Sequence, residues 1–428
     1  MRYSQQQVAA ADNSRFSNKA VKVKYIFSYY VLLAYFFIEY IRPQDYFSII
    51  GVISPTLFIS GILSISWLIN GDKKILKEPP MYLFLLLILQ SAISMSYAVN
   101  YYYAYVSVRE LTVYCFACVL PMIMVFTSHD RLFKFLNYWM LMHLFISVMS
   151  IMHRGKGSGS FLNDENDLAL ALNMFIPFPW LMLKSNGITR KRKIFYLITF
   201  IILIMGVITT FSRGGFLGLL SVIFGIILLS KNKFRNTIFL IVLCSIFYYL
   251  VSNKYVAEME TISDTGEATA HERLYSWKVG WLMFLDNPII GVGAGNYPRR
   301  ALEYELVLDM DRLYKPGRVL LGREAHSIYF TVLPECGLLG TIMFIAILYS
   351  LFRRLRVILK LENTPGLHDG IINDYCLIAK ALLISLLGFL VTGAFISVFY
   401  YPEFWYLLGL VLMLERLTNQ HLTKINAG

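Results

Sequence analysis

Three side chains that could bind and activate a phosphate-linked substrate stand beside apolar stretches of the chain. Arg213 lies in Ser212-Arg-Gly-Gly215, between two apolar runs. Arg273 lies in a long polar segment, and His326 stands where that segment meets the next apolar run. A guanidinium grips phosphate through paired hydrogen bonds, and an imidazole, with an ordinary pKa of about 6.5, can accept a proton at neutral pH. Together they indicate an enzyme that acts on a lipid diphosphate.

The elements that must position these groups are membrane helices. The chain has 428 residues, of which 57% are hydrophobic and 15% charged. Apolar runs of about 20 residues recur along it, as in transmembrane helices. We therefore expect an all-α fold, a polytopic transmembrane helical bundle of about twelve spans. The expected spans are 23–41, 47–69, 81–98, 109–127, 132–152, 168–184, 194–211, 214–230, 237–251, 325–352, 375–396 and 400–415.

Lysine and arginine are dense in alternate loops between these spans. The dense segments hold Arg2, Arg15, Lys19, Lys22, Lys24, Lys73, Lys74, Lys77, Arg131, Lys134, Lys184, Arg190, Lys191, Arg192, Lys193, Lys231, Lys233, Arg235, Arg353, Arg354, Arg356, Lys360, Arg416 and Lys424. The opposite short loops carry only Arg42, Arg154, Lys156 and Arg213. Because cytoplasmic loops are enriched in these residues, both termini are expected to be cytoplasmic. The net charge of +12 then suits anionic membrane lipids, and no basic soluble domain indicates nucleic-acid binding.

This topology divides the chain into five parts. We expect a disordered cytoplasmic tail at 1–22, transmembrane helices 1 to 9 over 23–251, a large outer loop at 252–324, helices 10 to 12 over 325–415, and a cytoplasmic tail at 416–428. Within the outer loop, apolar residues at helical spacing predict an amphipathic helix over 271–286 that lies near the interface. These residues are Leu274, Trp277, Trp281 and Leu285.

Each of the three leading residues also has a purely structural interpretation. Arg213 could be an interfacial arginine at a tight turn, Arg273 could belong to a solvated helix face, and His326 could anchor a helix end. On the functional interpretation, Gly214 and Gly215 let a phosphate approach the guanidinium and the first amides of the next helix. Arg273 would then hold the second phosphate, and His326 would serve as the base.

Other polar residues give weaker signals. Ser212, Asn163, Asn166 and Arg323 are candidate contacts to donor or acceptor. The carboxylates in 163–167 lack the spacing of a calcium loop, so turn formation or hydroxyl binding is favoured and no metal or other cofactor is expected. Glu324 and Glu335 could orient His326, although Glu335 lies about 13 Å along a helix from it. Gly291-x-Gly-x-Gly295 is predicted to form a turn, because no strand precedes it.

In order and spacing, four segments resemble the O-antigen ligase and polymerase superfamily of bacterial membrane glycosyltransferases. They are Gly159-Ser-Phe-Leu-Asn-Asp-Glu-Asn166, Phe211-Ser-Arg-Gly-Gly215, the stretch from Arg273 through Gly291-Val-Gly-Ala-Gly-Asn296, and the stretch from His326 through Glu335 to Gly340. In this family the histidine is often followed by asparagine, whereas Ser327 follows it here. The resemblance covers roughly residues 155–345.

The resemblance implies a helical, metal-independent glycosyltransferase of the GT-C class in the bacterial inner membrane. Such an enzyme moves a glycan from undecaprenyl diphosphate to an acceptor hydroxyl of lipid A-core, a glycan or a protein, on the periplasmic face. Arg213 and Arg273 would bind the diphosphate, and His326 would assist the acceptor. A ligase is favoured over a polymerase with the same site. A polysaccharide or lipid transporter and a membrane scaffold are the alternatives from other classes.

Overall fold

The computed structural model describes residues 25–47, 54–157, 162, 164–230, 232–241, 245, 271–308, 319–365, 367 and 369–427. Every regular element in these residues is a helix, which confirms the all-α fold class. The predicted tail at 1–22 lies outside the described residues. The predicted tail at 416–428 continues the last helix as far as Ala427.

The helices of the described residues follow in two halves of the chain. The first half contains α2 (Ile26–Ile41), α3 (Pro43–Tyr46), α5 (Pro55–Asn70), η1 (Lys73–Lys77), α6 (Pro79–Ser94), α7 (Tyr101–Val113), η2 (Tyr114–Val119), α8 (Leu120–Val125) and α9 (His129–Met152). The second half contains α10 (Glu165–Phe175), α11 (Pro177–Met182), α12 (Arg190–Thr209), α13 (Arg213–Leu228), a helix at 271–286, α15 (Tyr297–Leu308), α16 (Tyr329–Lys360), η4 (Leu361–Asn363), α17 (Gly370–Gly393) and α18 (Pro402–Ala427).

Several helices have the length and composition of membrane spans. Among the described residues, five are long and apolar enough to cross a bilayer: Tyr101–Val125, His129–Met152, Arg190–Thr209, Tyr329–Asn363 and Gly370–Gly393. Four shorter helices, α2, α5, α6 and α13, are also apolar. The polytopic bundle is thus confirmed, while the number of twelve spans stays a prediction. The expected span at 237–251 falls largely outside the described residues.

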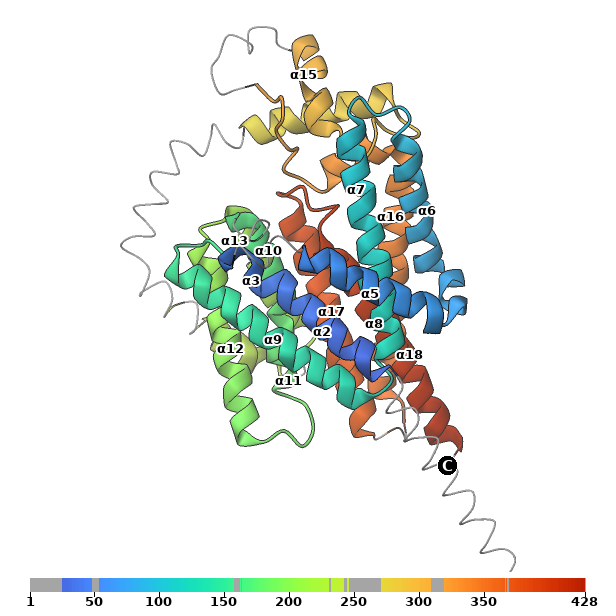
Figure 1. Ribbon diagram of the computed structural model, residues 1–428. Coiled ribbons are helices and arrows are strands. Elements are labelled where there is room, and N and C mark those ends of the chain that lie inside the picture. The colour runs from blue at the N-terminus through green and yellow to red at the C-terminus, as the bar shows by residue number, and fades with distance from the viewer. Residues whose placement is uncertain are drawn as a thin grey trace, which may run out of the picture.

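Helix 271–286 lies across one end of the bundle, crosswise to α6, α7 and α16, and α15 stands at the same end (Figure 1). We call these two helices the end layer, and this end of the bundle the site end. Helix 271–286 has the predicted bounds. Its buried side packs Val279 and Met283 against Tyr297, and the expected apolar stripe includes Leu274, which is 57% exposed. The stripe therefore faces outward, as an interfacial helix requires.

The end layer docks onto a break in α16. Gly337 has φ 61° and ψ −165°, a conformation that favours glycine, and it interrupts the helical hydrogen bonding. The freed groups pair with the segment after helix 271–286. The amide of Leu338 donates to Pro288 (2.8 Å), and the amide of Val292 donates to Pro334 (2.8 Å). The predicted turn at 291–295 is therefore a docking segment, and it ties the end layer to the bundle.

The centre of the bundle is formed by α17 and α18. Residues 404–414 of α18 are buried without interruption, which is typical of a helix surrounded by others. Trp405 stacks on Phe84 with ring centroids 4.0 Å apart. This packing fixes the connection between α17 and α18, residues 394–401, which reaches the site end.

Candidate functional site

The turn before α13 places Arg213 at the first position of a helix. Phe211 adopts a left-handed backbone conformation with φ 53°, which lets the chain reverse directly after α12. Ser212 is the N-cap, and its hydroxyl accepts a hydrogen bond from the amide of Gly215 (2.9 Å). Such a cap satisfies one of the free amides of a helix start. The Arg213 side chain is exposed there, beside the positive end of the helix dipole.

The two glycines after Arg213 allow close packing of α13, while the approach of a phosphate to this turn stays a prediction. A Cβ atom on Gly215 would lie 2.4 Å from Cβ of Ala169, and one on Gly214 would lie 2.8 Å from Cβ of Phe395. Neither position faces open space. The missing side chains instead let α13 approach α10 and the connection that follows α17.

The first turn of α10 joins the same site. Asp164 is its N-cap, and Oδ1 accepts hydrogen bonds from the amides of Asn166 (2.8 Å) and Asp167 (3.4 Å). The side-chain oxygen of Asn166 in turn accepts from the Ser212 hydroxyl (2.7 Å). Asn166 and Ser212, two of the predicted substrate contacts, are thus in contact with each other. Asn163 lies outside the described residues.

Arg273 comes to this site from the end layer, on the first turn of helix 271–286, where it is half-buried. Burial lowers the pKa of its guanidinium, and the positive charge of Arg213 lowers it further, while Asp164 acts in the opposite direction. A neighbouring charge has such an effect at short range. The structure therefore brings Arg213 within electrostatic reach of Arg273 from a distant segment of the chain. Two neighbouring positive charges favour the binding of an anion.

His326 lies on the segment that enters α16, with a left-handed backbone at φ 51°. Neighbouring contacts hold this segment: the indole nitrogen of Trp277 donates to the carbonyl of Ala325 (3.0 Å), and the amide of Ile328 donates to Gly393 (2.8 Å). The buried Ser327, which stands where the family often has asparagine, accepts through its carbonyl from the hydroxyl of Thr331 (2.8 Å).

The electrostatics of His326 link it to Arg273 and Arg323. Desolvation by the surrounding protein lowers the pKa of the imidazole, and the charges of Arg273 and Arg323 lower it further, whereas Asp164 raises it. A lowered pKa keeps the ring neutral at pH 7, and a neutral ring can accept a proton. The side chain itself is exposed, so a substrate hydroxyl could reach it. Arg323, another predicted contact, is therefore part of the same electrostatic environment.

The two glutamates predicted as orienting groups have different surroundings. Desolvation raises the pKa of Glu324, while a hydrogen bond from Ser397 and the charge of Arg299 oppose that rise. Glu335 is buried, and its carboxylate accepts from the amides of Gly295 (2.8 Å) and Tyr297 (2.9 Å). Glu335 therefore holds the start of α15, and its hydrogen bonds are made with this segment rather than with His326.

Two hydrogen bonds made by neighbouring tyrosines at this end of the bundle were not predicted from the sequence. The hydroxyl of Tyr400 donates to Glu335 (2.8 Å), and Tyr401 is hydrogen-bonded to Asp167. In the sequence, paired tyrosines at the end of an apolar run are typical of an interfacial belt, so these two hydrogen bonds are found only in the tertiary structure. In the part of the chain that the structure describes, no three His, Cys, Asp or Glu side chains converge as metal ligands.

The fold and this site define a multi-pass helical membrane protein with a cationic site and a histidine at one end of the bundle. Residues 198–345 match the family model described as O-Antigen ligase, a region that contains Arg213, Arg273 and His326. The match confirms the resemblance to the O-antigen ligase superfamily and supports a glycan ligase or polymerase type of function. None of the curated proteins matches the chain.

Proposed function

We propose that this protein is an O-antigen ligase-like glycosyltransferase, which moves a glycan from undecaprenyl diphosphate to an acceptor hydroxyl. The observation that carries the proposal is that Arg273 lies within electrostatic reach of both Arg213 and His326, so that side chains from three separate segments meet at one end of the bundle. The family match over 198–345 supports the general reaction type. The acceptor would be lipid A-core, another lipid or a protein.

In the proposed reaction, Arg213 and Arg273 bind the two phosphates of the donor. The acceptor oxygen forms a bond to the anomeric carbon as the bond from that carbon to the diphosphate oxygen breaks. The acceptor proton passes to His326, and undecaprenyl diphosphate leaves with the negative charge. Fixed cations that face the developing charge lower the barrier without a metal ion. A polymerase would perform the same step with a second lipid-linked glycan as its acceptor.

The site end would face the periplasm, with both termini in the cytoplasm and the protein in the inner membrane. The basic loops support this orientation through the excess of lysine and arginine in cytoplasmic segments. The end of α18 lies at the opposite end of the bundle from the end layer (Figure 1). A periplasmic site would meet lipid-linked glycans after their export, together with acceptors on the same membrane face.

The deciding experiment is a transfer assay with purified protein, a lipid-diphosphate glycan donor and a separate acceptor. Arg213→Lys and Arg273→Lys should each lose most activity, because a point charge does not reproduce the planar fork of arginine. Arg190→Lys is a matched control, since Arg190 is also the first residue of a helix but lies on α12, away from the site. EDTA should leave transfer unchanged.

Full transfer by both site variants would exclude the arginines from diphosphate binding. EDTA inhibition that Mg²⁺ reverses would instead indicate a metal site at 163–167. Analysis of product length separates the two reaction types: a ligase modifies the foreign acceptor once, whereas a polymerase extends the lipid-linked glycan when no other acceptor is present.

A further inference from the structure

A pocket of about 300 Å³ lies in the end layer, between helix 271–286 and α15. Its lining consists of Leu282, Asp286, Arg300, Glu303, Tyr304 and Val307. These residues belong neither to the arginine and histidine site nor to the five long apolar helices. In Figure 1, α15 extends away from the bundle beyond helix 271–286. The pocket therefore lies outside the membrane-spanning part of the protein.

The polar groups of this pocket are held in place by one another. Nε of Arg300 donates a 2.9 Å hydrogen bond to Oε2 of Glu303, and Nη2 lies 2.8 Å from the same oxygen. The hydroxyl of Tyr304 is hydrogen-bonded to Asp286 and accepts a bond from the side-chain amide of Asn287 (3.4 Å). Within the described residues, the arginine–glutamate pair leaves Oε1 of Glu303 and Nη1 of Arg300 for other partners. The pocket thus offers acceptors and donors side by side.

The composition of the lining restricts the kind of ligand. One arginine and two carboxylates give an excess of negative charge, which disfavours a phosphate or another anion. In the part of the chain that the structure describes, no third acidic, histidine or cysteine side chain joins Asp286 and Glu303 as a metal ligand. Leu282 and Val307 add apolar surface, and Val307 is 79% exposed. A neutral molecule with several hydroxyl groups and a C–H face, such as a sugar, suits this lining, because each hydroxyl can both donate and accept.

The pocket and Arg273 lie at opposite ends of one helix. Arg273 is on the first turn of helix 271–286, and Asp286 is its last residue. The two positions are separated by about 20 Å along the helix axis. A glycan held by its diphosphate near Arg273 would therefore reach the pocket only with sugars that are remote from the reacting bond.

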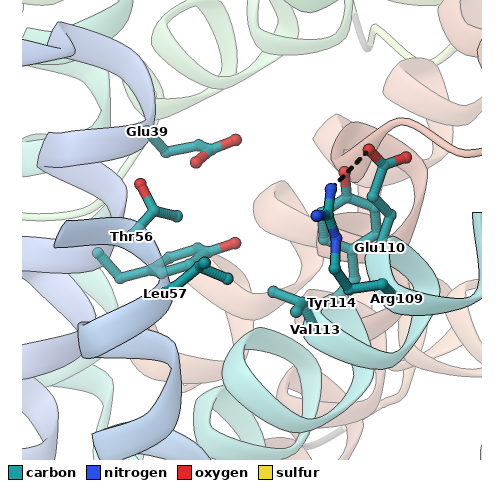
Figure 2. Close-up of a pocket in the computed structure, with 8 residues that line it drawn as sticks. Glu39, Thr56, Leu57, Arg109, Glu110, Val113 and Tyr114 are labelled. Carbon is teal, nitrogen blue, oxygen red and sulfur yellow. Dashed lines mark ion pairs between the residues drawn. The ribbon is translucent and has the colours of Figure 1, made fainter. Parts of the chain in front are cut away.

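A second polar cavity differs in its position. Figure 2 shows it between Glu39 on one wall and Arg109 with Glu110 on the other. Arg109 and Glu110 lie within the span Tyr101–Val125, so this cavity is set among membrane helices. Of the two cavities, the pocket in the end layer is the one on the outside, where a hydrophilic glycan would extend.

We propose that the end-layer pocket binds one sugar unit of the donor glycan, remote from the diphosphate, an inference that rests on the proposed transferase function. Sugar hydroxyls would donate to Asp286 and Glu303 and accept from Arg300, and the C–H face of the ring would lie against Leu282 and Val307. Hydrogen bonds of this kind are strong because the protein partner is charged. The pocket would add affinity for long donors without taking part in the bond exchange.

A binding experiment on the full-length protein tests the pocket without the lipid diphosphate. The probe is the donor glycan released from its lipid by mild acid and separated by length. We expect the unmodified protein to bind it, and the double variant Asp286→Ala with Glu303→Ala to bind about tenfold more weakly or worse, as the loss of a charge-assisted hydrogen bond requires. Asp130→Ala, an exposed carboxylate on α9, should bind like the unmodified protein. Val307→Trp keeps every polar group but fills the pocket, and it should also weaken binding.

The transfer assay then tests the position of the pocket. With donors of one and of many repeat units on the same lipid, the double variant should lower kcat/KM about tenfold for the long donor alone. An equal loss with both donors would place these residues in the transfer step and overturn the proposal. Absence of glycan binding by the unmodified protein, or unchanged binding by the folded double variant or by Val307→Trp, would overturn it too. Failure of transfer with intact, pocket-dependent glycan binding would instead contradict only the proposed transferase function.

Discussion

The hydroxyl of Ser212 donates a 2.7 Å hydrogen bond to the side-chain oxygen of Asn166. This bond joins the first turns of α13 and α10, which lie 46 positions apart in the chain. Ser212 also caps α13 through the amide of Gly215. One serine therefore fixes both the start of the helix that carries Arg213 and its distance from the Asp164 turn.

Ser212→Ala should lower both stability and transfer. Loss of an N-cap costs about 1 kcal/mol, so the midpoint of thermal unfolding should fall. Thr189→Ala is the matched control, because Thr189 caps α12 in the same way, at a position away from the site. We expect similar losses of stability in the two variants, but a loss of transfer only in Ser212→Ala. Equal activity at equal stability would show that the Ser212–Asn166 bond does not position Arg213.

His326→Ala should slow transfer by about 10²–10⁴-fold, the usual contribution of a general base. Donor binding should persist, because the arginines supply the phosphate contacts. Transfer and donor binding would be measured on the same preparation, with His153→Ala, an exposed histidine at the end of α9, as control. Unchanged transfer would remove His326 from the mechanism. Joint loss of binding and transfer would make it a phosphate ligand or a structural anchor.

The acid limb of the pH profile of kcat should report the lowered pKa of His326. Only the neutral ring accepts a proton, so kcat should fall as the pH drops through that pKa, below about 6.5. Asp164→Asn removes a charge that raises the pKa, so its limb should move to lower pH. Arg323→Gln removes a charge that lowers it, so its limb should move to higher pH. Limbs that stay in place would assign the titration to another group.

Glu335→Gln should weaken the attachment of the end layer. The glutamine amide would place N–H donors toward the donors of Gly295, Tyr297 or Tyr400, and an unsatisfied buried group costs about 1–3 kcal/mol. We expect a lower unfolding midpoint and faster proteolysis of the end layer. Glu303→Gln on α15, where the side chain is 51% exposed, should change neither. Wild-type stability of Glu335→Gln would show that the carboxylate does not hold this layer.

A topology experiment tests the orientation. A cysteine introduced at Asp264, in the predicted outer loop but outside the described residues, should react with an impermeant thiol reagent added to intact spheroplasts. A cysteine at Lys191 should react only after the membrane is opened. The four native cysteines in the described residues are buried, so their background should be low. The reverse pattern of labelling would place the site end in the cytoplasm.

Local patterns in the sequence predicted the helices and their faces. Helix 271–286 was recognisable because the spacing of Leu274, Trp281 and Leu285 is a property of neighbouring turns. The start of α13 was recognisable because the apolar run resumes at residue 214, directly after the short polar segment that holds Arg213. The expected spans likewise coincide with most helices of the bundle, since a membrane helix must satisfy its backbone hydrogen bonds within one continuous apolar segment.

The tertiary structure decided what these helices place together. Gly214 and Gly215 look like a phosphate-binding turn in the sequence, yet their role depends on Phe395 and Ala169, which are distant in the chain. Glu335 could be excluded as a partner of His326 by helix length, but its bonds to Gly295 and Tyr297 require the break at Gly337. Such contacts depend on close packing between distant segments, which the spacing of residues along one segment does not encode.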